Sequence, residues 1–379
     1  MVGDRSPIQH NMRVLYFLDS VGRGGAEMQA LDVCRNAAEH GIEMTFVTAQ
    51  GGVLEDDFRD TGVYFERFER KLPIDLYLAS KLRNLIKQRN IDIVHGYQPV
   101  DGLHLYLASR GRKGVRKVLS FQGFIQDRKN RLTAKFLVPR MEANIAVSRG
   151  LKKWLAETDN LDTANHFTVI YNGADPKRLK PSAKSIKEEL GLPADTLLAG
   201  MIGNFYREPR KDQLTLCRAL PEVFSTVGNV HCVFAGGIEN GAEDKFADCM
   251  GFCIEQKIID RVHFLGTRSD VPDILAELDV FVFSSLHEGL PIAVSEAMLA
   301  GVPMIVSDIE PLLEASGDGE YAEVFPVKDH SALSKKLVGL LDDGDARAAL
   351  AKKGRQFAEE HFSIQAHMKS LLALYNSLL

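Results

Sequence analysis

The sequence predicts an α/β protein of two doubly wound domains that face each other, and three observations support this. The chain has 379 residues, enough for two or three domains of roughly 100–200 residues. In both halves, apolar runs of strand length alternate with amphipathic helices across short loops, which is typical of parallel sheets. The alternation pauses once, at residues 174–182, where Pro176 and Pro181 prevent a continuing helix, and we interpret this stretch as the interdomain linker.

The same strand–helix alternation is expected in each half. The first half begins with an apolar strand at 13–19, a glycine-rich turn, and a helix from Ala26 that Gly41 ends. Further strands are expected at 44–49, 91–96, 117–123 and 144–148, with helices at 56–61, 76–89, 102–110 and 134–143. In the second half, strands are expected at 196–204, 231–237, 262–266, 280–285 and 303–308, with helices at 213–227, 243–256, 271–277 and 292–300.

The composition is that of an ordinary globular protein. With 45% hydrophobic and 26% charged residues, disordered and fibrous classes are excluded. No apolar run reaches about 18 residues, so no transmembrane helix is expected, and the polar start lacks the apolar core of a signal peptide. Five irregularly spaced cysteines without a metal-binding pattern indicate free, mostly buried thiols. We therefore expect a cytoplasmic protein.

The net charge of −5 hides an asymmetry between the two halves. Residues 1–181 carry 28 Lys and Arg against 21 Asp and Glu, whereas residues 182–379 carry 18 against 30. Within 110–153, 13 basic residues are opposed only by Asp127 and Glu142. This stretch is either a solvated face or, at 126–140, a patch that holds the protein peripherally on the inner, anionic membrane surface. Nucleic acid is not expected as a partner, because no nucleic-acid-binding module is visible.

Two glycine-rich or basic loops follow predicted strands. Gly22–Glu27 opens the first helix, and its glycines either form a tight turn or let backbone amides approach a phosphate or sugar. It departs from the dinucleotide-binding pattern, which needs glycine at the position of Glu27. The second loop, 203–212, places Arg207, Arg210 and Lys211 at a strand's carboxyl end, where open α/β sheets bind ligands. These cations could neutralise a diphosphate; the alternative is a solvated charged loop.

The most specific stretch is residues 284–303, which contains EGLPIAVSEAMLAGVP. Glu288 lies in a strand-to-helix loop, and Glu296 lies about one turn into the following helix. The amides of Gly289, Leu290, Ile292 and Ala293 are near that helix's start, where backbone N–H groups lack intrahelical partners. We expect these amides to meet a phosphate or hexose while Glu296 accepts hydrogen bonds from a ribose diol.

The two glutamates and the residues between them resemble the signature of the family 4 retaining glycosyltransferases. Other segments resemble this family in the same order, among them GGAE, DIVHGYQP, IAVSRGLKKWL, VIYNGAD, EPRKD and LDVFVFSSLHEGLP. The resemblance spans roughly residues 13–362 and implies the GT-B fold, with two facing Rossmann-like domains and a nucleotide-sugar cleft between them. It implies an acceptor-side domain over 1–178, a donor-binding domain over 179–362, and a C-terminal helix at 363–379 that packs back on the first.

The resemblance also implies roles for individual residues. Glu296 matches the family's ribose-binding glutamate, and Glu288 matches the glutamate near the transferred sugar. Lys211 matches the lysine that holds the donor diphosphate together with an arginine. Gly24 and Gly25 match the first-domain loop that closes on the donor, and the backbone around Leu265–Gly266 matches the segment flanking the nucleobase.

Two positions depart from the family pattern. The usual arginine after the glycine that ends the strand is Asn204 here, so Arg207 or Arg210 must replace it, and we prefer Arg207. A histidine-glycine pair common in the family is Gln122-Gly123 here. Glutamine can hydrogen-bond a sugar hydroxyl or a phosphate but cannot carry a proton.

The resemblance implies a retaining hexosyl transfer from a nucleotide-diphospho-sugar, with a UDP-sugar favoured over a GDP-sugar. The acceptor would be a sugar or lipid-linked saccharide in cell-surface polysaccharide or glycolipid synthesis. Neither a metal nor another cofactor is expected, because the cations and the helix terminus can hold the charge on the leaving diphosphate; Asp343-Gly-Asp345 is expected to be a polar turn. The alternatives are a non-catalytic nucleotide-sugar-binding protein and a nucleotide-sugar epimerase.

Overall fold

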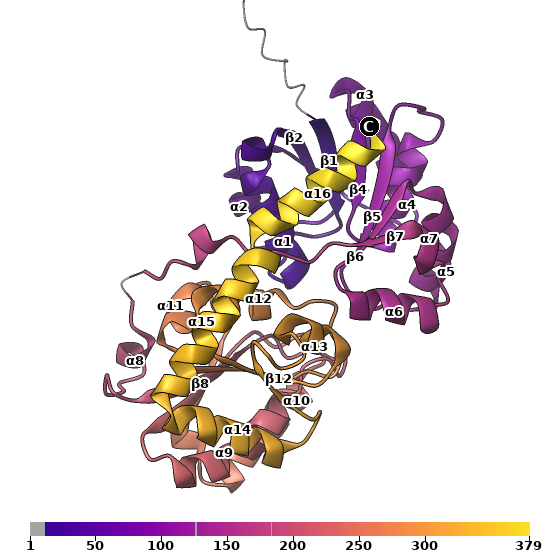
Figure 1. The fold of residues 1–379 in the computed structure, drawn as a ribbon. Helices are drawn as coiled ribbons and strands as arrows, with labels where there is room; N and C mark the ends of the chain where they lie inside the picture. Colours follow the sequence, from indigo (N-terminus) through magenta and orange to yellow (C-terminus); the bar gives the residue numbers. More distant parts are fainter. Residues whose placement is uncertain (1–11, 126, 183) are drawn as a thin grey trace, which may run out of the picture. The chain divides into compact units, whose positions relative to one another are not determined.

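The computed structural model describes residues 12–125, 127–182 and 184–379. The chain divides into two compact units, shown in Figure 1. Unit 1 comprises the residues up to Tyr171 together with His367–Leu379, and unit 2 comprises Asn172–Ala366. These limits differ by a few residues from the expected domain limits at 178 and 363.

Unit 1 contains a seven-stranded sheet in which every pairing is parallel. The strands lie in the order β3-β2-β1-β4-β5-β6-β7. Their bounds are β1 Met12–Leu18, β2 Ile42–Thr48, β3 Tyr64–Arg67, β4 Ile93–Gly96, β5 Arg116–Phe121, β6 Ala143–Ala146 and β7 Phe167–Val169. The order reverses direction between β1 and β4, as in a doubly wound fold.

The connections of unit 1 are mostly helical. They are α1 Gly25–Asn36, η1 Ala38–His40, α2 Glu55–Arg59, α3 Leu76–Gln88, α4 Pro99–Ser109, α5 Arg128–Leu137, η2 Val138–Arg140, α6 Arg149–Glu157 and α7 Thr163–His166. The helix expected at 134–143 was misplaced: the observed helix α5 begins six residues earlier, at Arg128. The Asp127 side chain accepts a hydrogen bond of 2.8 Å from the amide of Asn130 and so caps α5.

Unit 2 repeats this architecture with six parallel strands in the order β10-β9-β8-β11-β12-β13. The strands are β8 Leu197–Ile202, β9 Val230–Ala235, β10 Val262–Gly266, β11 Val280–Phe283, β12 Met304–Ser307 and β13 Glu323–Phe325. The helices are η3 Pro176–Leu179, α8 Ile186–Glu189, α9 Gln213–Thr226, α10 Glu243–Glu255, η4 Ile259–Arg261, α11 Val271–Glu277, α12 Ile292–Ala300, α13 Glu310–Ser316, α14 His330–Asp342 and α15 Gly344–His361.

The hydrophobic pattern located the central strands and missed three short ones at sheet edges. β1 and β11 are almost entirely buried, which is why they read as continuous apolar runs. β3, β7 and β13 are only three or four residues long and partly exposed, so no such run marks them. All five cysteines are free and buried, as expected. Across the described residues, no helix has the length and apolar character that crossing a membrane requires.

The C-terminal helix α16, Ile364–Leu378, belongs to unit 1 from His367 onward. Its residues Met368, Leu371 and Tyr375 are fully buried at helical spacing. The Tyr375 hydroxyl donates to the Tyr16 hydroxyl at 3.0 Å and lies 2.6 Å from Nδ1 of His95, so it joins α16 to β1 and β4 (Figure 1). Nε2 of His95 lies 2.7 Å from the Ser120 hydroxyl on β5.

This buried network contains a neutral histidine. If Ser120 donates to Nε2, then Nδ1–H donates to Tyr375, and both ring nitrogens are satisfied without a second proton. Burial lowers the pKa of His95 from 6.5 to about 3. Protonation would add a charge to a site surrounded by low-dielectric protein.

We predict that acid destabilises unit 1 through His95. The unfolded chain binds the proton near pH 6.5 and the folded chain only near pH 3, so stability present at neutral pH falls as the pH drops. Between pH 7 and pH 5 the expected loss from this group is about 2 kcal/mol. Urea unfolding at both pH values measures it. His95→Gln should reduce the pH dependence by about this amount and leave the part that other groups contribute, such as buried His367, whose pKa is lowered to about 4 by burial. His330→Gln at an exposed position should leave the full difference; equal pH dependence in all three proteins would contradict the assignment.

Candidate active site

The strand order of unit 2 reverses between β8 and β11, and the loops after these two strands lie together. The amide of Asp212 donates to the Ser284 carbonyl at 3.0 Å, and the amide of Leu286 donates to the Arg210 carbonyl at 2.6 Å. Lys211 and Ser285 form an isolated antiparallel bridge between the loops. In doubly wound sheets such a reversal leaves a crevice at the carboxyl ends of the strands, which is where ligands bind.

Lys211 and Glu288 form a buried ion pair at this point. Nζ of Lys211 contacts Oε1 of Glu288, and the two side chains are only 9% and 12% exposed. The Ser285 hydroxyl lies 2.6 Å from the same carboxylate oxygen, and Nζ of Lys211 lies 4.0 Å from the centre of the Phe283 ring. Burial lowers the pKa of Lys211, and the Glu288 carboxylate opposes that shift. A cation in such surroundings interacts strongly with any anion that approaches it.

Helix α12 begins directly after the loop that carries Glu288. Its N-cap residue is Pro291, whose side chain offers no acceptor to the first-turn amides. Leu290 and Ile292 are buried, and Ala293 is half-buried. The amides of Ile292 and Ala293, with those of Gly289 and Leu290 just before, therefore form a terminus that favours negative charge.

Glu296 lies on α12 and forms an ion pair with Arg178, a residue that the sequence analysis did not identify. One of its carboxylate oxygens lies 2.6 Å from a guanidinium nitrogen of Arg178, and the side chains are 8% and 15% exposed. Arg178 belongs to η3, inside the stretch expected to be only a linker. Asp175 caps η3 by accepting from the amide of Lys177 at 2.9 Å. The Asp-Pro start of this short helix was the available signal that the segment is ordered.

Asn204, which departs from the family pattern, has a structural role in this edge of the sheet. Its side-chain oxygen accepts from the amide of Gly237 at 2.8 Å, so it joins the ends of β8 and β9. A Cβ on Gly236 would lie 2.2 Å from the Gly203 carbonyl oxygen, so only glycine permits this close approach. Gly266, at the end of β10, accepts from the amide of Gly236 at 2.8 Å and lies on the same edge.

The two candidate arginines of the 203–212 loop are held differently. The amide of Arg207 donates to Glu239 at 2.8 Å, and its carbonyl accepts from Lys245 at 2.7 Å, while its side chain is exposed. The Arg210 guanidinium lies 5.4 Å from the Tyr206 ring and 3.5 Å from the Glu208 carboxylate. The Arg210 side chain is therefore already engaged within the loop.

The remaining predicted residues lie at the carboxyl edge of the sheet in unit 1. Gly24 is the N-cap residue of α1 and Gly25 begins it. A Cβ on Gly24 would lie 2.6 Å from the carboxylate of Glu27, whose pKa is raised by burial. Gln122 follows β5 directly and is half-buried.

The acidic stretch Asp343–Asp345 forms the start of a helix. Asp343 caps α15 by accepting from the amide of Ala346 at 2.9 Å. Among the described residues, no group of three or more His, Cys, Asp or Glu side chains is placed to hold a metal ion. Metal independence stays a prediction.

Two family patterns match consecutive parts of the chain. The pattern described as Glycosyltransferase Family 4 matches residues 23–178, and that described as Glycosyl transferases group 1 matches residues 182–357. This chain belongs to the family 4, group 1 glycosyltransferases. The match confirms the expected family, and the glycosyltransferase class of enzyme with it.

Individual glycosyltransferases show the same similarity. The chain is 27% identical over 259 residues to the lipopolysaccharide core biosynthesis mannosyltransferase LpsB of Rhizobium meliloti, covering 65% of this chain and 68% of that protein. It is 25% identical over 316 residues to the UDP-Gal:alpha-D-GlcNAc-diphosphoundecaprenol alpha-1,3-galactosyltransferase of Escherichia coli, covering 79% of each.

A solved structure has the same fold. The crystal structure of Anabaena Alr3699/HepE in complex with UDP and glucose superposes with a TM-score of 0.82 at 20% identity, covering 97% of this chain and 100% of that one. Together with the two doubly wound sheets, this confirms the expected GT-B fold class.

We predict that Arg178 positions Glu296 for binding of the donor. Glu296→Gln and Arg178→Met should each raise KM for the donor several-fold and leave kcat nearly unchanged, because the ribose is remote from the reacting carbon. Arg347→Met is the matched control, since it breaks an ion pair with Asp279 at the opposite end of β11 in the same unit. Steady-state kinetics measures both constants; a loss confined to kcat in the Arg178 variant would contradict the positioning role.

Proposed function

We propose that this glycosyltransferase is a retaining, metal-independent hexosyltransferase that uses a nucleotide-diphospho-sugar. The acceptor is a sugar or lipid-linked saccharide in cell-surface polysaccharide or glycolipid synthesis. The observation that carries the proposal is the buried Lys211–Glu288 pair beside the start of α12, at the reversal of the strand order. One cation, one carboxylate and a helix terminus there suit a diphosphate with a sugar attached.

Each proposed role follows from what the residue can donate or accept. Lys211 and Arg207 hold the diphosphate as negative charge grows on it, and Arg207 is preferred because Glu208 and Tyr206 already engage Arg210. Glu288 contacts the transferred hexose and Glu296 the ribose. The phosphate or the hexose meets the backbone amides at the start of α12, those of Gly289, Leu290, Ile292 and Ala293. Gly266 flanks the base, and Gly24 and Gly25 close on the donor. Gln122 hydrogen-bonds a sugar hydroxyl or a phosphate.

The main catalytic contribution in this proposal is electrostatic. Charge develops on the leaving diphosphate as the bond to the anomeric carbon breaks, and preorganised donors stabilise that charge. Removing one such donor typically costs about 3–4 kcal/mol of transition-state stabilisation. The Lys211 side chain needs little reorganisation, because the Phe283 ring and Glu288 already hold it in place.

Named relatives support a UDP-sugar and a lipid-linked acceptor. The E. coli relative is named for UDP-Gal and a diphosphoundecaprenol acceptor. The Anabaena structure contains UDP and glucose. We extend both features to this chain, with a UDP-sugar preferred over a GDP-sugar.

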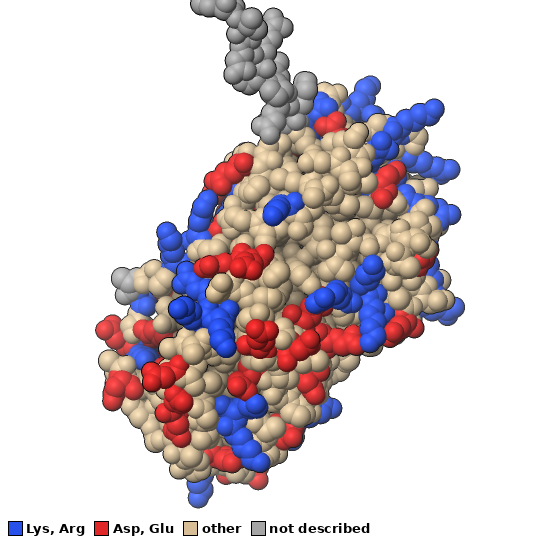
Figure 2. Space-filling view, viewed as in Figure 1, with Lys and Arg blue, Asp and Glu red and all other residues tan. Residues whose placement is uncertain are grey.

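We also propose that the region 126–140 holds the protein peripherally on an anionic membrane surface. Gln126 lies outside the described residues; from Asp127 on, the segment forms α5 and η2. Its Leu132 is 58% exposed and Phe136 is 41% exposed, among exposed cations. In Figure 2, Lys and Arg side chains project along the edge of unit 1 where Figure 1 places α4, α5 and α7. Apolar and basic side chains on one surface are the composition of an interfacial helix.

The proposed function is tested with purified protein and a panel of UDP- and GDP-sugars. We expect release of the free nucleotide with one of them, accelerated by a saccharide acceptor, and proton NMR of the product should show the donor's anomeric configuration. An inverted product would overturn the retaining mechanism. Nucleotide-sugar binding without any turnover would favour a non-catalytic protein.

We predict that Lys211→Ala and Arg207→Ala each lower kcat by about 100-fold or more, because both charges act on the diphosphate in the transition state. Arg210→Ala should change kcat much less, and it is the matched control from the same loop. Single-turnover kinetics at saturating donor separates this effect from weaker binding. A nearly normal Arg207→Ala with an inactive Arg210→Ala would reassign the second cation.

We predict that activity survives EDTA. Lys211, Arg207 and the α12 terminus supply the positive charge that a divalent ion supplies in metal-dependent transferases. The initial rate with and without excess chelator measures this. Complete loss that Mg²⁺ or Mn²⁺ restores would refute the metal-free mechanism.

A further inference from the structure

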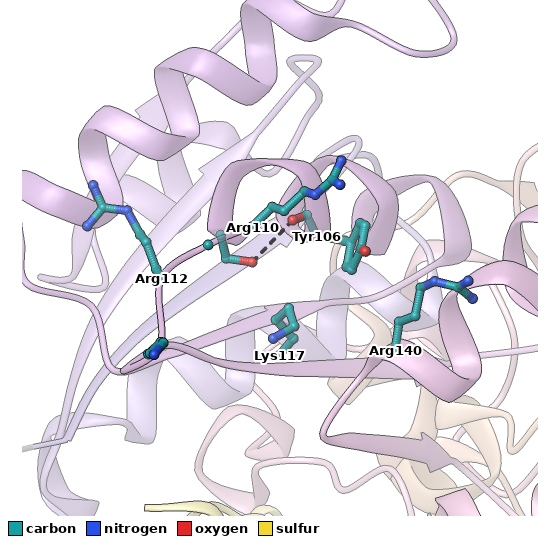
Figure 3. A pocket seen from close by; sticks show the side chains of 8 residues that line it. Tyr106, Arg110, Arg112, Lys117 and Arg140 are labelled. Carbon is teal, nitrogen blue, oxygen red and sulfur yellow. Dashed lines mark hydrogen bonds between the residues drawn. The ribbon is translucent and has the colours of Figure 1, made fainter.

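A basic pocket of about 330 Å³ lies in unit 1, at the amino-terminal edge of the sheet (Figure 3). Its walls come from the end of α4, the turn that leads into β5, the start of β5, and η2. Its lining residues are Tyr106, Ser109, Arg110, Gly111, Arg112, Lys113, Lys117 and Arg140. Gln122 and Gly24 follow the carboxyl ends of strands in the same sheet, so this pocket lies at the opposite edge from them.

The pocket collects cations that the protein does not neutralise. Lys117 pairs with Glu142 at 2.8 Å. Within 12–125, 127–182 and 184–379, no acidic side chain forms an ion pair with Arg110, Lys113 or Arg140. Like charges in one pocket repel one another, so an anion that enters it gains attraction from several sides.

Uncharged contacts order the backbone at Arg110 and the side chain of Arg140. Arg83 donates to the carbonyls of Leu107 and Arg110, both at 3.1 Å, and so fixes the turn between α4 and β5. The Arg140 guanidinium lies 4.1 Å from the centre of the Phe136 ring and donates one hydrogen bond to the Phe136 carbonyl at 2.6 Å. Its remaining N–H groups are available to a ligand.

Three of the basic side chains that line the pocket lie around Tyr106. Figure 3 shows Arg110, Lys117 and Arg140 around Tyr106, while the Arg112 guanidinium points away from it. Two arginine forks and a phenol that can donate match the oxygens of a phosphate, which Arg binds in a bidentate manner. A group with two negative charges gains more from this set than a group with one.

The neighbouring surface is apolar and favours a lipid as the source of that phosphate. The Tyr106 and Phe136 rings meet edge to face with centres 5.5 Å apart, and Phe136 and Leu132 of α5 are exposed beside the pocket. A phosphate bound between the arginines would leave its ester group near these side chains. Aromatic and aliphatic side chains next to cations are typical of membrane-surface sites.

We propose that this basic pocket binds a phosphomonoester or diphosphate group, with a lipid headgroup as its source, separately from the donor site. The proposal extends the membrane part of the proposed function. It does not depend on the transfer chemistry, and phosphate binding can be measured without a membrane.

The first experiment measures binding of inorganic pyrophosphate by calorimetry in the Lys211→Ala background, which weakens the diphosphate site of unit 2. Adding Arg110→Ser and Arg140→Ser should weaken the remaining binding at least about tenfold, because two charge-assisted contacts are lost. Lys71→Ser with Lys87→Ser is the matched control, since it removes two exposed charges of the same unit outside both the pocket and region 126–140. Arg110→Ser alone should give an intermediate loss, and unchanged thermal unfolding verifies that the variants fold.

The second experiment measures flotation with phosphatidylcholine vesicles that contain phosphatidate or phosphatidylserine at equal surface charge. We expect a preference for phosphatidate that the Arg110/Arg140 pair of substitutions abolishes and the Lys71/Lys87 pair retains. Pyrophosphate binding that depends on Arg110 and Arg140, without any such vesicle preference, would identify a soluble phosphate as the source and overturn the lipid assignment. If neither probe depends on Arg110 and Arg140, the pocket proposal is wrong; an equal fall in flotation for both pairs would show diffuse attraction to the membrane instead.

Discussion

The reversal of strand order between β8 and β11 is the constraint on which the candidate site depends. The chain leaves these neighbouring strands in opposite directions, so the loops at their carboxyl ends stay uncovered by the helices that follow. Backbone hydrogen bonds from Asp212 and Leu286 then join the two loops. Lys211 and Glu288, 77 residues apart in the chain, therefore meet because of the winding of the sheet.

Stability alone does not account for the ion pair formed there. Removing a lysine and a glutamate from water costs several kcal/mol per ion, and an apolar pair of similar volume is often as stable. The surroundings instead hold each charge in a defined place, with Phe283 beside Lys211 and Ser285 beside Glu288. Glu296 repeats this arrangement on α12, where Arg178 holds its carboxylate. In both pairs, one charge orients the other within the candidate site.

Much of this could be predicted from the sequence, and each failure has its own physical cause. Central strands and the spacing of Glu288 and Glu296 are visible because they are local in the chain. Arg178 was missed because its partner lies over 100 positions away, and no local pattern marks a long-range ion pair. The edge strands β3 and β7 were missed because they are short and half-exposed. The start of α5 was missed because the cap at Asp127 determines it, whereas the apolar pattern begins later.

In the basic stretch 110–153, the partners of each cation indicate which residues can bind an anion better than the summed charge does. Arg131 is committed to the buried carboxylate of Asp159 at 2.6 Å, and Lys117 to Glu142, so both serve the fold of unit 1. Replacing Arg131 would leave Asp159 buried without that partner, and a loss of membrane binding could then reflect damage to the fold. Among the exposed cations that remain, Arg128 and Lys129 lie at the start of α5, and Arg110, Lys113 and Arg140 lie around the basic pocket. A diffuse patch attracts any anionic surface, whereas a pocket with fixed guanidinium groups can select a chemical group, and only the second property requires a defined three-dimensional arrangement.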